Sequence, residues 1–134
     1  MTERTRLSVF ITTYNNGRTL AACLESVKWA DEIVVLDSFS TDATLAIGQR
    51  YGACITQHEF MGYGPQKQMA LAATTNDWVL LLDADEALSP ALQVEIRQLL
   101  QAGPAAEGYE IPRQEQLFWR MYNPATRMNH YLRL

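Results

Sequence analysis

The sequence is poor in cysteine. Only Cys23 and Cys54 occur among 134 residues, and they form neither a C-x-x-C pair nor a Cys/His spacing suited to zinc. This excludes a disulfide-stabilised scaffold and a small zinc module. We expect both cysteines to be small buried hydrophobic side chains in a protein of a reducing compartment.

Long apolar runs are also missing. The longest, Trp78–Leu82, has five residues, whereas a membrane-spanning helix needs about 20. The first apolar stretch, Leu7–Ile11, is short and runs into polar residues rather than a cleavage site. The sequence therefore predicts neither a membrane span nor an export signal, and we expect a cytoplasmic protein.

An excess of positive charge is absent as well. Eleven Lys and Arg against 15 Asp and Glu give a formal net charge of −4, which argues against nucleic acid as a partner. The charge is uneven: residues 1–107 carry seven basic and thirteen acidic groups, whereas 108–134 carry four and two. Because a Gly-Pro pair at 103 and 104 precedes this change, we predict one α/β domain over 1–103 and the incomplete start of a second region over 104–134.

What the sequence does contain is an alternation of short apolar runs and segments with helical periodicity. Strands are predicted at 7–11, 32–36, 53–56 and 78–82. The expected helix N-caps are Asn16, Thr41 or Asp42, and Ser89. Near-continuous apolar strands that alternate with helices are typical of an α/β fold with a mostly parallel sheet covered by helices on both faces.

Polar residues follow each predicted strand. These clusters lie at 12–15, 37–40, 57–59 and 83–85. In parallel α/β sheets, ligands bind beyond the carboxyl ends of the strands, where these clusters converge. The sequence therefore predicts a ligand site at this edge of the sheet.

Several common site fingerprints are missing. The sequence has no G-x-G-x-x-G after the first strand, no P-loop and no G-x-S-x-G, which excludes a dinucleotide-binding fold, a P-loop enzyme and a serine hydrolase of that type. Lys67 lies early on a helix, after a glycine-rich loop. It could meet a diphosphate there, or lie solvated on the surface.

Asp83 and Asp85 lie two residues apart, at the exit of the most apolar strand. If that exit is extended, the period of two points both side chains the same way. Two neighbouring carboxylates suit Mg²⁺ or Mn²⁺, particularly where a diphosphate supplies further oxygens. The alternative is a pair of solvated or capping acids ahead of the helix that begins after Ser89.

Asp37 ends another apolar strand. An ionised carboxylate accepts a hydrogen bond from the N3–H of uracil, whereas N3 of cytosine is itself an acceptor. Asp37 therefore favours uridine over cytidine if it contacts a base. The alternative is a local turn or a helix cap.

Three segments in order resemble the motifs of family 2 glycosyltransferases with the GT-A fold: 7–15 (LSVFITTYN), 31–44 (DEIVVLDSFSTDAT) and 78–86 (WVLLLDADE). Together with GYGPQKQ at 62–68, they are most similar to the bacterial branch that includes lipopolysaccharide core glycosyltransferases. Ser38 and Phe39 stand where relatives usually have Asp-Gly, so the turn lacks the family's glycine.

The resemblance implies roles for particular residues. Nucleotide-sugar binding is implied for Thr13, Tyr14, Asn15, Asp37, Lys67 and Asp83. Within this set, Asp37 would contact the base and Asp83 the ribose side of the sugar nucleotide. Asp85 would ligate a divalent metal, Mg²⁺ or Mn²⁺, on the diphosphate.

The resemblance also implies a reaction. The family moves a sugar from a nucleoside-diphosphate sugar, here expected to be a UDP-sugar, to a glycan or lipid-linked acceptor in one inverting displacement. This implies metal-dependent synthesis of cell-envelope polysaccharide or lipopolysaccharide. Neither Glu110 nor Glu115 matches the family's general base, so we expect the base beyond Leu134 and the chain to be truncated or split from its acceptor half. The alternative is a sugar-nucleotide-binding module without turnover.

A basic and aromatic tail closes the sequence, with Arg113, Phe118, Trp119, Arg120, Tyr122 and Arg127. Such a tail could make peripheral contact with anionic lipid at the inner face of the inner membrane. Pro112 and Pro124 interrupt any continuous apolar helix, so we favour the alternative that the aromatic residues cover the edge of a sheet.

Overall fold

A computed structural model of the chain describes residues 4–106, 108–112, 116–117, 120–121 and 130–132. The chain divides into two compact units, residues 1–104 and 105–134. Within the part of the chain that is described, no helix combines the length and the hydropathy needed to cross a membrane.

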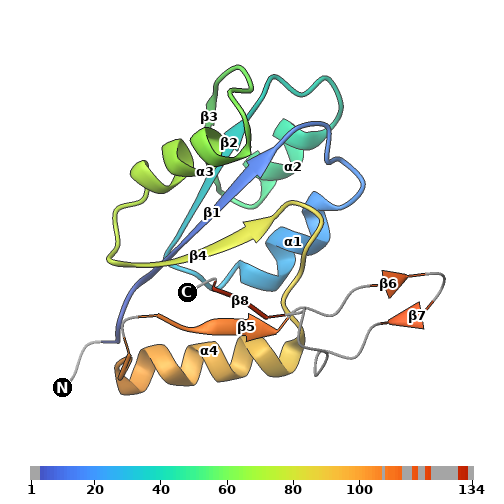
Figure 1. Ribbon diagram of the computed structural model, residues 1–134. Helices are drawn as coiled ribbons and strands as arrows, with labels where there is room; N and C mark the ends of the chain where they lie inside the picture. Colours follow the sequence, from blue (N-terminus) through green and yellow to red (C-terminus); the bar gives the residue numbers. More distant parts are fainter. Residues whose placement is uncertain (1–3, 107, 113–115, 118–119, 122–129, 133–134) are drawn as a thin grey trace. The chain divides into compact units, whose positions relative to one another are not determined.

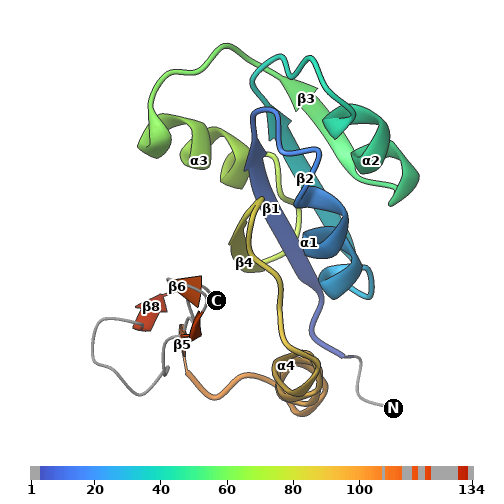
Figure 2. The same ribbon diagram turned by 90° about the vertical axis from the view of Figure 1, so that its right-hand side faces the viewer.

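The first unit is built on a four-stranded parallel sheet in the order β3-β2-β1-β4. Its strands are β1 (Leu7–Thr13), β2 (Glu32–Asp37), β3 (Cys54–Gln57) and β4 (Trp78–Asp83). Its helices are α1 (Leu20–Val27), α2 (Thr44–Arg50), α3 (Tyr63–Ala72) and α4 (Pro90–Ala102). Figures 1 and 2 show α3 on one face of the sheet and α1 and α2 on the other. The predicted α/β fold, with a mostly parallel sheet between helices, is confirmed.

The core forms on both faces of β1, an interior strand. Phe10 is buried against Val34 and Leu36 of β2 and Ala70 of α3. The side chains of β1 that alternate with Phe10 face the other side and are fully buried: Leu7, Val9 and Ile11. Each such side chain stabilises the fold by about 1.5–3 kcal/mol, which holds the carboxyl ends of the strands in place.

The ends of two helices follow from local sequence. Ser89 caps α4, because its Oγ accepts a hydrogen bond from Leu92 N–H at 3.2 Å and Pro90 is the first helical residue. Gly52 follows α2 with a φ of 74°, a left-handed conformation that glycine adopts without strain. The start of α4 agrees with the predicted cap at Ser89.

The expected cap of α1 is wrong. The helix begins at Leu20, and Asn16 lies before it in the loop. The Oδ1 of Asn16 accepts a hydrogen bond from Tyr14 N–H at 2.8 Å, so this side chain stabilises the loop rather than the helix. A local Asx-type bond competes with capping, as is common for asparagine.

The two cysteines differ. Cys23 on α1 is fully buried, with its Sγ 3.7 Å from the carbonyl oxygen of Asp83. Burial, together with the nearby carboxylates of Glu86, Asp85 and Asp83, raises the pKa of the Cys23 thiol to about 12, so the thiol is neutral and unreactive near pH 7. Cys54 is exposed because β3 is an edge strand, so the expectation of burial is wrong for this cysteine.

In the second unit, the described residues form two short antiparallel strand pairs. Strand β5 (Glu110–Pro112) pairs with β8 (His130–Leu132), and β6 (Gln116–Leu117) pairs with β7 (Arg120–Met121). Apart from Arg120, the basic and aromatic residues of the predicted tail lie outside the described residues. Membrane contact and the covering of a sheet edge therefore both stay predictions.

Candidate functional site

The loops that follow the four parallel strands meet at one edge of the sheet (Figure 1). The strand register places Thr13 beside Asp37, Thr12 beside Asp83, and Asp37 beside Gln57. We call this the carboxyl edge, formed by residues 13–17, 37–42, 57–63 and 83–86, together with Lys67. It is the edge where parallel α/β sheets bind ligands.

Asp37 is fully buried at the end of β2, and other residues of the chain donate hydrogen bonds to its carboxylate. Oδ1 accepts hydrogen bonds from Thr13 Oγ1 (2.6 Å) and Ser40 Oγ (2.5 Å), and Oδ2 accepts from Ser40 N–H (2.8 Å) and Gln57 Nε2 (3.2 Å). Burial alone would raise the pKa of Asp37, but these hydrogen bonds outweigh it and lower the pKa. The turn that the sequence allowed is therefore present, and contact between Asp37 and a base stays a prediction.

Asn15 ties the loop after β1 to the loop after β2. Its N–H donates to Ser40 Oγ (2.7 Å), and its Oδ1 accepts from Thr41 N–H (2.8 Å). Asn15 has a left-handed φ of 50°, which asparagine tolerates better than most residues. Among the three residues predicted to line a pocket here, Tyr14 presents its side chain to solvent, whereas Thr13 and Asn15 hold the loops together.

Asp42 makes a second tie between the same loops. Its Oδ2 accepts from Gly17 N–H (2.9 Å), and its Oδ1 accepts from both the N–H (2.9 Å) and the hydroxyl of Thr44. A Cβ at Gly17 would lie 2.8 Å from Asp42 Oδ2, so only glycine permits this approach. The sequence predicted Thr41 or Asp42 as the N-cap of α2, but the cap position is Ala43, which makes no side-chain cap bond. The bond from Gly17 N–H to Asp42 spans 25 residues and has no local signal.

Lys67 meets Asp83 between α3 and the end of β4. The Lys67 Nζ lies 3.2 Å from Asp83 Oδ1, and the two side chains are 33% and 35% exposed. Lys67 is therefore both partly solvated and paired with a carboxylate, and its contact with a diphosphate stays a prediction. The structure brings together two of the residues predicted to bind a nucleotide sugar, and both remain within reach of solvent.

The chain turns immediately after β4. Glu86 N–H donates to the carbonyl oxygen of Asp83 (2.9 Å), and Asp83 N–H donates to Glu86 Oε1 (2.9 Å). The expectation of an extended exit is therefore wrong, and the period of two does not apply beyond Asp83. Asp85 lies exposed in this turn and makes no hydrogen bond or ion pair with any residue that the structure describes.

A divalent cation fits this turn by donor type. Carboxylate oxygens are the ligands that Mg²⁺ and Mn²⁺ prefer, and the carboxylate of Asp85 is not engaged by the described residues. Residues 4–106 and the described parts of the tail contain no group of three or more His, Cys, Asp or Glu that could hold a metal. The donor set therefore suits a cation that shares a bound diphosphate, and does not form a closed protein site.

Gln66 is a residue that the sequence analysis missed. It is 2% exposed on α3, its Nε2 donates to Ser38 Oγ (3.0 Å), and its Oε1 has no hydrogen-bond partner among the described residues. Its neighbour Lys67 pairs with Asp83, so one turn of α3 contacts the ends of both β2 and β4. The available signal was its position directly before Lys67.

Large apolar side chains are exposed along the carboxyl edge: Tyr14, Phe39, Phe60, Met61 and Tyr63. The rings of Phe60 and Tyr63 pack edge to face, with centroids 5.2 Å apart. Among the described residues, the one other large apolar side chain this exposed is Val94 on α4. Such a concentration of exposed rings indicates a ligand surface.

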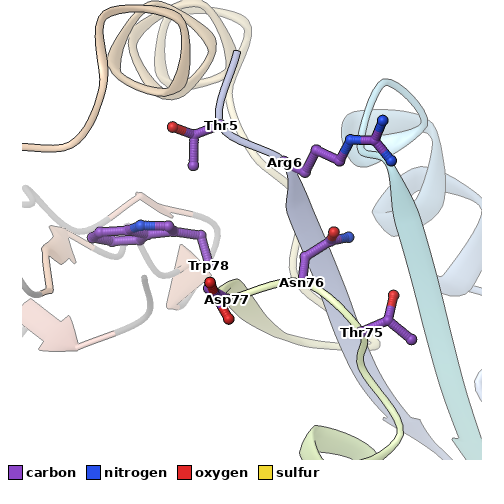
Figure 3. A pocket seen from close by; sticks show the side chains of 6 residues that line it. All are labelled: Thr5, Arg6, Thr75, Asn76, Asp77 and Trp78. Atoms are coloured by element: carbon purple, nitrogen blue, oxygen red, sulfur yellow. The ribbon is translucent and has the colours of Figure 1, made fainter. Parts of the chain in front are cut away.

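A hollow of about 350 Å³ opens at the opposite end of the sheet, lined by Thr5, Arg6, Thr75, Asn76, Asp77 and Trp78 (Figure 3). It contains no predicted site residue. Thr75 Oγ1 donates to Glu32 Oε2 (3.0 Å), Asn76 Nδ2 donates to Ser8 Oγ (3.0 Å), and Arg6 points away from the Trp78 ring in Figure 3. The hollow has room for a ligand, but two of its polar side chains are already hydrogen-bonded within the chain and none of the predicted site residues lines it, so the chemistry points to the carboxyl edge.

Known proteins resemble this chain in sequence and in fold. The family model for glycosyl transferase family 2 matches residues 8–133. LpsC of Rhizobium meliloti, a lipopolysaccharide core biosynthesis glycosyltransferase, is 36% identical over 129 residues, which cover 92% of this chain and 48% of LpsC. A crystal structure of TarS from S. aureus has a TM-score of 0.63 and 26% identity over 73% of this chain and 33% of that one.

A third comparison includes bound ligands. Glucosyl-3-phosphoglycerate synthase from Mycobacterium tuberculosis, in complex with Mn²⁺, UDP and glucosyl-3-phosphoglycerate, has a TM-score of 0.59 and 26% identity over 75% of this chain and 41% of that one. The chain spans about a third to a half of the length of the curated relatives that it matches. The resemblance seen in the sequence is confirmed by these matches: the chain belongs to glycosyl transferase family 2 and has the GT-A fold of that family.

Proposed function

We propose that this chain is the donor-binding part of a metal-dependent glycosyltransferase that moves a sugar from a UDP-sugar to a glycan or lipid-linked acceptor with inversion. We assign the reaction to the synthesis of cell-envelope polysaccharide or lipopolysaccharide. One observation carries the proposal. In a family 2 chain, the Lys67–Asp83 ion pair and the exposed carboxylate of Asp85 lie together at the end of β4. A cationic amine beside carboxylates suits a diphosphate bound with a divalent cation.

The nucleotide sugar is proposed to bind Thr13, Tyr14, Asn15, Asp37, Lys67 and Asp83. Support for UDP and Mn²⁺ comes from the M. tuberculosis synthase, whose complex contains both. Support for an envelope glycan comes from LpsC, a lipopolysaccharide core enzyme, and from TarS, a poly(ribitol-phosphate) β-N-acetylglucosaminyltransferase.

In the proposed mechanism, Lys67 exchanges Asp83 for the diphosphate. Its ammonium then stabilises part of the negative charge that develops on the departing nucleoside diphosphate. Asp83, once released, accepts hydrogen bonds from ribose hydroxyls. Asp85 would hold Mg²⁺ or Mn²⁺ against the diphosphate, and the bound cation would supply further positive charge for the leaving group. The ties from Asp37 and Asn15 keep the loops in place during this exchange.

No carboxylate of this chain is assigned as the general base that takes the proton of the acceptor hydroxyl. We propose that the base belongs to an acceptor-side portion, since the curated relatives are two to three times as long as their match to this chain. The same difference in length favours the second candidate, a sugar-nucleotide-binding module without turnover. Cytoplasmic location and contact with the inner face of the inner membrane stay predictions.

The test is Asp85→Asn, with UDP binding measured by calorimetry with and without Mn²⁺. We expect the part of the affinity that depends on Mn²⁺ to be lost, because the substitution removes a charged oxygen ligand. We expect the free energy of unfolding to stay within about 0.5 kcal/mol, as is usual for an exposed substitution. The matched control is Asp77→Asn, which removes the same charge from an exposed residue at the other end of the sheet.

Two outcomes would count against these assignments. Unchanged Mn²⁺-dependent affinity in Asp85→Asn contradicts the metal ligand. A wild-type affinity for UDP that does not depend on Mn²⁺ contradicts the metal-dependent transferase and favours the binding-module candidate instead.

A further inference from the structure

A tight turn follows β2, and Phe39 lies at its corner. The carboxylate of Asp37 closes the turn by accepting hydrogen bonds from Ser40 N–H (2.8 Å) and Ser40 Oγ (2.5 Å). Phe39 has a φ of 58°, a left-handed conformation in which the Cβ of an L-residue is crowded. Asn15 and Phe39 are the two non-glycine residues with positive φ in the described chain, and Phe39 lacks the short polar side chain that makes asparagine tolerant.

Packing does not account for this ring. The side chain of Phe39 is 55% exposed, so it contributes less to the core than a buried phenylalanine would. A residue that combines an unfavourable backbone conformation with an exposed apolar ring does not stabilise the fold. Such positions concentrate at sites where a ligand uses the side chain.

The turn itself is fixed on both sides. Ser40 and Thr41 are hydrogen-bonded to Asn15 in the loop after β1, at 2.7 Å and 2.8 Å. On the other side, Ser38 Oγ accepts from Gln66 Nε2 of α3 at 3.0 Å. The backbone on either side of Phe39 is therefore held, while the ring faces solvent at the carboxyl edge.

We propose that Phe39 stacks on the base of the nucleoside diphosphate, and that Asp37 is the positioning residue that holds this ring. The inference rests on the proposed function and assigns its base contact. Asp37 is fully buried and its carboxylate already accepts four hydrogen bonds from its own chain, so direct contact with a base would have to replace one of them. Phe39, two residues on, has an exposed flat face, and every nucleobase has a π-face that can stack on such a ring.

The experiment separates the ring from the backbone strain. Phe39→Tyr keeps both, Phe39→Leu removes the ring and keeps the strain, and Phe39→Gly removes both. Each variant of the full chain is titrated with UDP and, separately, with inorganic pyrophosphate, in Mn²⁺ buffer by calorimetry. A thermal melt of each variant reports on folding.

We expect Phe39→Tyr to bind UDP like the wild type, and Phe39→Leu and Phe39→Gly to bind it about tenfold more weakly. Pyrophosphate lacks a base, so its affinity should be the same in all four proteins. Because glycine relieves the left-handed strain, the Tm of Phe39→Gly should be no lower than that of the wild type.

Unchanged UDP affinity in Phe39→Leu and Phe39→Gly overturns the inference and leaves the proposed function standing. An equal loss for UDP and pyrophosphate also overturns it, because the ring would then act on the loop rather than on the base. A wild-type chain that binds no UDP overturns the proposed function, and the inference with it.

Discussion

The amino edge and the carboxyl edge of the sheet, at the two ends of its strands, contain similar types of residue. They differ in how many of their charged side chains are hydrogen-bonded within the chain. At the amino edge, residues 4–8, 31–32 and 74–78, two of the three acids, Asp31 and Glu32, are held by hydrogen bonds within the chain, while Asp77 is exposed. Asp31 accepts two hydrogen bonds from Arg4 at 2.7 Å each and one from Leu7 N–H at 2.8 Å. Glu32 accepts hydrogen bonds from the Ser8 hydroxyl (2.7 Å), Thr75 N–H (2.8 Å) and the Thr75 hydroxyl (3.0 Å).

The carboxyl edge is only partly paired. Asp37 and Asp42 are hydrogen-bonded and hold the loops, but Asp85 is exposed in its turn and Lys67 shares an ion pair that is about one-third exposed. The exposed aromatic rings of the described chain also lie at this edge. Side chains that the fold leaves in solvent contribute little to stability, so a ligand can use them at small cost. Exposed charges that occur together with exposed aromatic rings therefore distinguish the carboxyl edge from the hollow of Figure 3, where the exposed acid Asp77 has no such rings beside it.

The largest expected effect tests whether Asp37 belongs to the paired part of the carboxyl edge. Asp37→Ala should lower the free energy of unfolding by about 3 kcal/mol, because it leaves the buried hydroxyl of Thr13 and the donors of Ser40 and Gln57 without their acceptor. Urea unfolding of the full chain measures this. Asp85→Ala is the matched control at the same edge and should cost less than about 0.5 kcal/mol. Equal stabilities for the two variants would contradict the division of this edge into structural and free acids.

A smaller effect is expected at the amino edge. Glu32→Gln should lower the free energy of unfolding by about 1 kcal/mol, since the amide turns one of the two accepting oxygens into an NH2 donor and so loses an acceptor for Ser8 or Thr75. UDP affinity should not change, because this edge lies at the opposite ends of the strands. A loss of UDP affinity at unchanged stability would contradict the structural role of Glu32 and the assignment of ligand binding to the carboxyl edge.

The same variant carries a pH dependence. Burial would raise the pKa of Glu32, but the hydrogen bonds from Ser8 and Thr75 outweigh it and lower the pKa below the ordinary value of 4.5. A depressed carboxyl pKa stabilises the fold above the unfolded value and loses that effect as pH falls through the folded value. The difference in stability between wild type and Glu32→Gln should therefore be full at pH 7 and shrink below about pH 4. A difference that grows on acidification would contradict this sign.

The fold could be predicted because its signals are local. The apolar runs of β1 and β4 and the Ser89-Pro90 start of α4 each act within a few residues, and they are the same in the sequence and in the structure. The polar residues at the strand ends could be located for the same reason. Alternation failed after Asp83, because a hydrogen bond from Glu86 closes a turn that has no glycine or proline to announce it.

What the sequence could not provide is the set of partners. Gln66 meets Ser38 across 28 residues, and Gly17 meets Asp42 across 25. Such tertiary hydrogen bonds depend on the packing of α3 and the loops, for which no periodic pattern exists. The sequence therefore names candidates such as Asp37 and Lys67. Only the structure shows that Asp37 is buried and hydrogen-bonded within the chain, whereas solvent can reach Lys67.

The smallest expected effect on folding concerns the Lys67–Asp83 pair. Lys67→Met keeps the length of the side chain and removes its charge. Because both partners are about one-third exposed, solvent screens the pair, and its loss should change the free energy of unfolding by less than about 0.5 kcal/mol. The affinities for UDP and for inorganic pyrophosphate with Mn²⁺ should both fall about tenfold, since the ammonium is proposed to meet the diphosphate.

Lys28→Met is the matched control, because Lys28 also forms an exposed ion pair, with Glu25 on α1. That variant should match Lys67→Met in stability and the wild type in binding. A stability loss above 1 kcal/mol in Lys67→Met with unchanged binding would place this pair with the structural acids and remove the strongest difference between the two edges.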